Sequence, residues 1–216
     1  MTPKDYSSIS PSAQSLLLLK GYTNIPYARE TAALMQGPEV FGLDFDDKDF
    51  WFWMRVLHFE NRYWSIDQLL KATGSTNILE LSSGYSWRGL ELCRTEAQLH
   101  YIDTDLPDVI ATKRQMMQQL PIGEALQGRL ELLPLNAVDP VAFRDTVRGF
   151  GEGPLTIVNE GLLMYLGPEE KEQLCRNIRE VLLQKGGCWI TADVYVKRSD
   201  EMRVQLPQSP SEAAFF

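Results

Sequence analysis

The stretch Asn77-Ile78-Leu79-Glu80-Leu81-Ser82-Ser83-Gly84 decides the fold that this sequence predicts. An apolar strand here runs into a turn of small residues, and a helix is expected to follow. A second predicted strand, over residues 98–103, ends in the acidic stretch Asp103-Thr104-Asp105. This order of strand, small-residue turn, helix and acid-ended strand is how a Rossmann-like sheet builds a nucleoside pocket.

The turn does not match the dinucleotide fingerprint. The pattern G-x-G-x-x-G needs three glycines, and only Gly84 and Gly89 are present. A small-residue turn that follows Glu80 fits S-adenosylmethionine better, because the nucleoside of this cofactor has no pyrophosphate to bind at a helix N-terminus. An NAD(P)-dependent oxidoreductase is therefore the weaker interpretation.

Strands and helices alternate from residue 77 onward. Further strands are predicted at 129–135, 154–159 and 187–196, with helices at 87–94, 107–120, 140–150 and 168–184. This alternation predicts a mostly parallel α/β sheet with helices on both faces. A sheet of this kind usually has two further strands as an antiparallel edge, and the sequence predicts neither of them. The uncovered edge favours pairing with another chain, so we expect a homodimer.

The first 73 residues are predicted to be helical and to form a cap or substrate lid over a cofactor-binding core of residues 74–216. One helix begins at Ser10-Pro11 and a second at Pro26. A third runs from about Asp49 to Thr73, either continuous or broken near Asn61. Aromatic residues crowd this third segment, where they form either the acceptor wall or, more often for any single residue, core.

The composition excludes several classes of partner. The net charge is −8 and the basic residues are scattered, which argues against nucleic acid. The run Leu16–Leu19 is far too short to span a membrane, and the N-terminus has no signal-peptide pattern, so we predict a cytoplasmic protein without a membrane partner. Cys93, Cys175 and Cys188 lack metal-ligand spacing, so we expect buried free thiols and no metal site.

Polar residues at the predicted strand ends are the candidate cofactor ligands. In a cofactor pocket, Glu80 attracts the positive sulfonium and amino groups or braces the loop; the alternative is a helix N-terminal cap or a salt-bridge partner. Asp103 and Asp105 compete for the ribose, and Asp105 is also placed to cap the helix begun by Pro107. Asn136 either contacts the adenine or forms the turn before the next helix.

The run Asn159–Leu166 gives the second group of candidates. Glu160 and Gly161 follow a predicted strand, where they face the crevice in which ligands bind to open α/β sheets. Tyr165 either orients a methyl acceptor or is an ordinary half-buried aromatic. His58 is a candidate base for a hydroxyl acceptor, whereas a carboxylate acceptor is already ionised and needs none.

Three motifs together resemble the leucine carboxyl methyltransferase family, over roughly residues 50–196. They are Glu80–Arg88 (ELSSGYSWR), Asp105-Leu106-Pro107 with Lys113-Arg114, and Glu160–Leu166 (EGLLMYL). The family includes bacterial polyketide O-methyltransferases similar to the tetracenomycin enzyme. The resemblance implies an S-adenosylmethionine-dependent O-methyltransferase that acts on a carboxylate or hydroxyl of a small molecule.

The resemblance also implies roles for individual residues. Glu80 and Gly84 would line the methionine end of the cofactor, Asp105 the ribose, and Asn136-Ala137 the adenine. Glu160 would lie near the amino-acid or sulfonium region.

An arginine in the helix before the first strand would hold the cofactor carboxylate. Arg55 and Arg62 both fit, because a spacing of seven residues puts them on one helix face. The alternative for both is a solvated face or an ion pair with Glu60.

The chain departs from the family pattern at three places. Ser82 stands where glycine is usual, Ser86-Trp87-Arg88 replaces Asp-Thr-Arg, and Asn136 replaces a common aspartate. The departures favour an alternative function, a non-catalytic partner or sensor that still binds S-adenosylmethionine.

Overall fold

The computed structural model describes residues 16–35, 45–46, 48–123 and 125–193. Within them, five parallel strands form one sheet in the order β3-β2-β1-β4-β5. The strands are β1 (Asn77–Leu81), β2 (His100–Asp105), β3 (Arg129–Pro134), β4 (Leu155–Asn159) and β5 (Gly187–Thr191). The prediction of a mostly parallel α/β sheet is confirmed. Residues 194–196, predicted to extend the last strand, lie outside the described residues.

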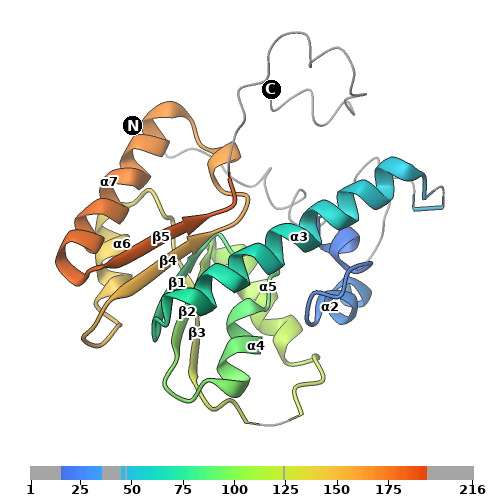
Figure 1. Ribbon diagram of the computed structural model, residues 1–216, viewed down its shortest axis with the longest axis horizontal. Helices are drawn as coiled ribbons and strands as arrows, with labels where there is room; N and C mark the ends of the chain where they lie inside the picture. Colours follow the sequence, from blue (N-terminus) through green and yellow to red (C-terminus); the bar gives the residue numbers. More distant parts are fainter. Residues whose placement is uncertain (1–15, 36–44, 47, 124, 194–216) are drawn as a thin grey trace.

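Helices cover both faces of this sheet (Figure 1). They are α2 (Ala28–Leu34), α3 (Phe50–Thr73), α4 (Arg88–Thr95), α5 (Pro107–Met117), α6 (Pro140–Val147) and α7 (Pro168–Lys185), with a 3-10 turn, η1 (Leu163–Tyr165). Residues 16–20 are also helical, whereas the helix start predicted at Ser10 lies outside the described residues. Helix α3 is continuous through Asn61, so a break there is excluded.

Local chemistry explains where α3 begins and ends. The Asp49 carboxylate accepts a hydrogen bond from Phe52 N at 2.7 Å, which satisfies one of the free donors of the first turn. Gly74 ends the helix with φ 61°, a left-handed conformation that glycine adopts without steric cost. Only the short segment 74–76 separates the end of α3 from the start of β1.

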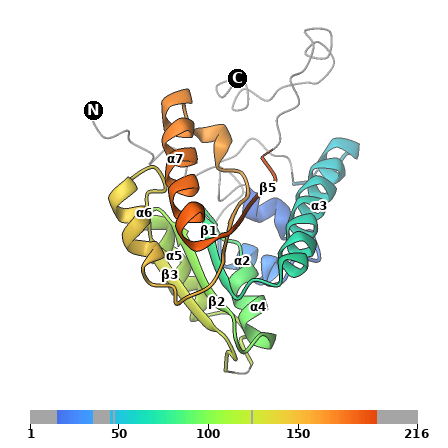
Figure 2. The same ribbon diagram turned by 60° about the vertical axis from the view of Figure 1, so that its left-hand side comes forward.

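Alternation along the strands sorts side chains between two cores. Leu79 and Leu81 of β1 pack with Phe143 of α6 and Leu174 of α7. Ile78 points to the opposite face and packs beneath α3. Figure 2 shows α6 and α7 on one side of the sheet and α3 on the other. Glu80, by the same alternation, lies on the α3 side.

The N-terminal helices are tied to the sheet rather than detached from it. Ile66 and Leu70 of α3 share a core with Ile78 and Val158. Trp87 Nε1 donates a hydrogen bond to Thr31 Oγ1 at 2.7 Å. The division into a cap and a core at residues 73 and 74 stays a prediction.

The aromatic side chains of α3 divide between core and surface. Phe52 and Tyr63 are buried, whereas Phe50 and Trp53 are 67% and 48% exposed. The segment thus supplies both core and a large exposed apolar surface. Homodimer formation stays a prediction.

The cysteines differ from the prediction of three buried thiols. Cys93 is buried, Cys188 is half-buried and Cys175 is exposed, so the prediction is wrong for Cys175. Among the described residues, no helix is both long and apolar enough to cross a membrane.

Candidate cofactor-binding site

The candidate site lies at the carboxyl edge of the sheet, where β2, β1 and β4 are neighbours. The strand order reverses between β1 and β4, and such a reversal is where open α/β sheets bind ligands. The turn Ser82–Gly84, Asp105 and the pair Glu160-Gly161 follow or end these three strands. Parallel pairing therefore gathers at one edge the motifs that the sequence analysis selected.

The turn after β1 adopts a backbone that favours glycine at two positions. Ser82 has φ 51° and Gly84 has φ 56°. For a residue with a Cβ, this left-handed backbone conformation costs about 1–2 kcal/mol of conformational free energy. The turn is pinned to β2, because Ser83 N donates to Thr104 O at 3.0 Å. Strain at Ser82 is the physical reason why glycine suits this position.

Asp105 fixes the end of β2 against this turn. Its Oδ2 accepts from Gly84 N and its Oδ1 from Leu106 N, both at 2.7 Å. Burial raises the pKa of Asp105 and outweighs the opposite effect of these two hydrogen bonds. Asp105 as a whole is 8% exposed, against 1% for Asp103.

Asp103 points inward beneath the turn. Lys113 Nζ donates to its Oδ2 at 2.6 Å, and the hydroxyl of Ser83 donates to its Oδ1. Burial raises the pKa of Asp103 to about 6, although Lys113 opposes this effect. Asp103 is thus enclosed and paired with Lys113, whereas Asp105 binds the backbone of the turn, and the choice between them for the ribose stays a prediction.

Glu80 is part of a buried ionic network around Arg88. The Arg88 side chain is completely buried, and its guanidinium lies 2.5 Å from Glu80 Oε1 and 2.7 Å from Asp67 Oδ1. Tyr101 OH donates to Glu80 Oε2 at 2.7 Å. Glu80 is only 1% exposed and is enclosed by these contacts, which are those of a residue that braces the turn.

Glu160 connects this network to the site. Its carboxylate lies 3.1 Å from Lys20 Nζ, 3.2 Å from Arg88 Nη2 and 3.8 Å from Arg62 Nη2. Burial by itself would raise the pKa of Glu160, but the three cations outweigh it and lower the pKa to about 2. Glu160 therefore stays ionised and links the N-terminal segment, α3 and α4 at the end of β4.

The two candidate arginines of α3 are placed differently. Arg62 Nη2 lies between the carboxylates of Glu160 and Asp193, at 3.8 and 3.7 Å. Arg62 Nε is buried and has no hydrogen-bond partner within the described part of the chain. Arg55 lies two turns, about 10 Å, closer to the helix start. The structure therefore brings Arg62 to the strand ends and leaves Arg55 away from them.

His58 lies one helical turn before Arg62. His58 is an exposed residue. Partial desolvation of its ring, together with the positive charge of Arg62, still lowers its pKa. Tyr165 lies in η1 and is half-buried. Both residues lie on segments that border the site.

The predicted adenine residues lie after β3. Asn136 is exposed, and its Oδ1 accepts from Val138 N at 3.2 Å, which is the turn that the sequence left open as an alternative. Ala137 is buried, and its carbonyl oxygen accepts from Asn177 Nδ2 at 3.0 Å. The geometry thus shows a structural role for both residues.

Sequence reasoning missed Lys20, Asp67 and Asp193 as members of the site or its support. Asp193 follows β5, and its carboxylate binds the backbone of the loop after β4. The general rule that residues after parallel strands line the ligand crevice would have selected Asp193. Lys20 and Asp67 had no comparable signal, because their role depends on distant partners.

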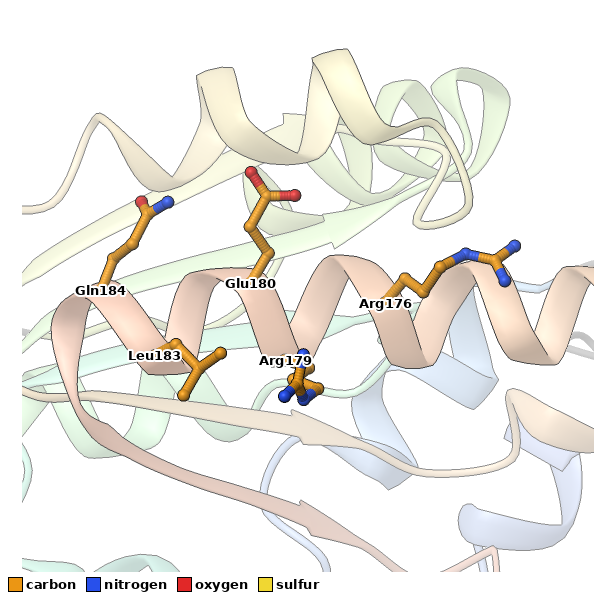
Figure 3. A pocket seen from close by; sticks show the side chains of 5 residues that line it. All are labelled: Arg176, Arg179, Glu180, Leu183 and Gln184. Carbon is orange, nitrogen blue, oxygen red and sulfur yellow. The ribbon is translucent and has the colours of Figure 1, made fainter.

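A shallow hollow of about 400 Å³ lies elsewhere, on the outer face of α7. Figure 3 shows the five side chains that line it, all from this one helix: Arg176, Arg179, Glu180, Leu183 and Gln184. No strand-end residue borders it. The hollow is therefore separate from the candidate site.

The parallel sheet, its order and the polar residues at its carboxyl edge define a Rossmann-like fold of the class I methyltransferase type. A sequence profile of the leucine carboxyl methyltransferase family matches residues 42–179. The chain belongs to the leucine carboxyl methyltransferase family.

Curated relatives include two from Mycobacterium sp., strains JLS and KMS, each with the name "Putative S-adenosyl-L-methionine-dependent methyltransferase". Each is 31% identical over 113 residues, which cover 52% of this chain and 37% of the relative. The chain thus spans well under half the length of these relatives.

Solved structures similar to the chain include two methyltransferases. The glycopeptide N-methyltransferase MtfA with S-adenosylhomocysteine is 19% identical, with a TM-score of 0.42, over 59% of this chain and 50% of MtfA. The magnesium protoporphyrin IX methyltransferase ChlM from Synechocystis PCC 6803 with bound S-adenosylmethionine is 13% identical, with a TM-score of 0.46, over 84% of this chain and 74% of ChlM.

Proposed function

We propose that the chain binds S-adenosylmethionine at the carboxyl edge of β1, β2 and β4 and takes part in methyl transfer to an oxygen of a small molecule. Membership of the leucine carboxyl methyltransferase family supports this cofactor. The observation that carries the proposal is Arg62, a half-buried arginine at the strand ends whose buried Nε is left unpaired among the described residues.

The environment of Arg62 suits the amino-acid end of the cofactor. A guanidinium presents a planar set of donors that matches a carboxylate. A buried donor without a partner costs about 1–3 kcal/mol, which a bound carboxylate would recover. Glu160, beside Arg62, supplies a negative charge for an ammonium or sulfonium group. The residues present therefore fit both charges of this ligand.

The ribose end is assigned to Asp105. Its two oxygens each accept one backbone hydrogen bond, and a carboxylate oxygen can accept a second one. The two bonds fix the carboxylate at the end of β2, so its free lone pairs are held ready for the ribose hydroxyls. Gly84, bound to Asp105, lets the backbone approach the ligand closely.

The acceptor side is assigned to the surface between His58 and Tyr165. Methyl transfer requires alignment of the nucleophile with the methyl group and exclusion of water. A lowered pKa favours the neutral form of the His58 imidazole, which is the form that takes a proton from a hydroxyl acceptor. A carboxylate acceptor would use the same surface without a base.

Calorimetric titration with S-adenosylhomocysteine tests the binding step. We expect a micromolar Kd for the wild type and loss of at least about tenfold in affinity for Asp105→Ala. Asp108→Ala is the matched control, because Asp108 is an exposed aspartate in the first turn of α5, and its Kd should be unchanged. Absence of wild-type binding would refute the proposed function.

A second candidate is a protein that binds the cofactor without transferring its methyl group. The left-handed φ of Ser82, where the family prefers glycine, is the observation that favours it. Turnover with a panel of carboxylates and phenols separates the two candidates. Tight binding without formation of S-adenosylhomocysteine, in both the wild type and Ser82→Gly, would favour the non-catalytic protein.

A further inference from the structure

The Asp193 carboxylate binds the backbone N–H groups of the loop that follows β4. Oδ1 accepts from Gly161 N at 2.6 Å, and Oδ2 accepts from Leu162 N and Leu163 N at 2.8 and 2.9 Å. The side chain is only 3% exposed. A single carboxylate therefore organises three successive amides at the border of the candidate site.

The carboxylate is itself held by the ends of β4 and β5. Asn159 Nδ2 donates to Asp193 Oδ2 at 2.8 Å and to Thr191 Oγ1 at 3.0 Å. Trp189 Nε1 donates to Asn159 Oδ1 at 2.7 Å, and Asp193 N donates to Thr191 Oγ1 at 3.1 Å. These bonds connect the loop to the paired strands β4 and β5.

The same carboxylate faces Arg62. Arg62 Nη2 lies 3.7 Å from Asp193 Oδ1 and 3.8 Å from Glu160 Oε1. Both distances are too long for a hydrogen bond, so the two acids attract the guanidinium without occupying its donors. A Cβ added to Gly161 would lie 3.4 Å from Arg62 Nη2, which shows that the loop and the guanidinium are in contact.

We infer that Asp193 is a positioning residue of the cofactor site. It fixes the backbone of Gly161–Leu163 and thereby sets the place of Arg62, which binds the carboxylate of the ligand. The inference rests on the proposed function. Asparagine cannot replace this aspartate, because its NH₂ group donates where the backbone N–H groups also donate.

The test compares two nucleoside ligands by calorimetry. S-adenosylhomocysteine carries the amino-acid carboxylate, whereas 5′-methylthioadenosine lacks it. Asp193→Asn should lower the affinity for S-adenosylhomocysteine at least about tenfold, which is the scale of a lost charge-assisted hydrogen bond. It should change the affinity for methylthioadenosine less than about twofold. Asp49→Asn is the matched control, because Asp49 also accepts a backbone N–H but lies about 20 Å from Arg62 along α3.

A double-mutant cycle tests the route through Arg62. In an Arg62→Gln background, Asp193→Asn should cost no further affinity, since the group that Asp193 positions is already lost. An additive loss, or an equal loss for both ligands, would overturn the inference and leave Asp193 a structural residue.

Two controls separate the possible failures. If the wild type binds neither ligand, the proposed function fails, and the inference with it. If Asp193→Asn does not fold, Thr191→Val is the second variant, because it removes only the hydroxyl that accepts from Asp193 N. Its loss of affinity should be smaller and again confined to S-adenosylhomocysteine. No loss in Thr191→Val would then count against the inference.

Discussion

Replacement of Arg88 by methionine tests whether one guanidinium holds the buried network together. The Arg88 side chain is completely buried and contacts Asp67, Glu80 and Glu160 at 2.7, 2.5 and 3.2 Å. Methionine keeps much of the length and apolar volume but removes the charge. Glu160 retains Lys20 and Arg62, whereas Glu80 loses its cation.

The expected loss follows from the ionisation of a buried carboxylate. A carboxylate without its cation takes up a proton rather than remaining charged in the interior. For a glutamate with an ordinary pKa near 4.3, this costs about 1.4 kcal/mol per pH unit above that value, or about 4 kcal/mol at pH 7. The value agrees with the roughly 3–5 kcal/mol for removing one partner of a buried pair. At pH 5.5 the same reasoning gives about 2 kcal/mol.

Urea unfolding followed by circular dichroism measures this loss at pH 7 and pH 5.5. The matched control is Arg176→Met, whose arginine is 60% exposed and lies 3.5 Å from Glu172. The control should change the free energy of unfolding by less than about 0.5 kcal/mol. A loss below about 1 kcal/mol for Arg88→Met at pH 7, or an equal loss at both pH values, would refute the reasoning.

Three further predictions concern stability. Ser82→Gly should raise it by about 0.5–1 kcal/mol, because relief of the left-handed φ outweighs the backbone entropy of glycine; a lower melting temperature would contradict this. Gly89→Ala should lower it by about 1–3 kcal/mol, since the new Cβ would lie 2.5 Å from Cδ1 of the buried Tyr101 ring; an unchanged urea midpoint would show that the ring shifts freely. Glu160, with a pKa of about 2, below the ordinary glutamate value near 4.3, contributes stability that is present above that ordinary value and is lost as the pH falls toward 2. Glu160→Gln should therefore have a lower free energy of unfolding than the wild type at pH 7, and this free energy should fall less as the pH is lowered toward 2. An equal fall for the variant and the wild type would contradict this.

The sequence predicted the order of the elements and the class of the fold because these depend on local patterns. Apolar runs, small-residue turns and proline helix starts are short-range signals. Asp139, for example, caps α6 and directly precedes Pro140, an order of residues that is typical of helix starts. The motifs at the ends of β1, β2 and β4 also gave the family, since parallel pairing brings strand ends to one edge.

The roles of individual acids were less predictable. Glu80 and Asp103 are paired neighbours in adjacent strands, and alternation points both beneath the helices. Asp105 lies two residues further, at the end of the strand. The sequence contained this alternation, but the cations that meet the two buried acids, Arg88 and Lys113, come from helices whose packing only the fold defines.

The sequence by itself determined the parallel sheet, its carboxyl edge and the set of candidate residues. Only the tertiary structure brought Arg62 to Glu160 and Asp193, placed Glu160 among three cations and revealed Asp193 as the residue that binds the loop after β4. The physical reason is range. Strand and turn preferences act between residues a few positions apart, whereas these ion pairs and hydrogen bonds join residues that are distant in the chain and meet only when the helices pack on the sheet.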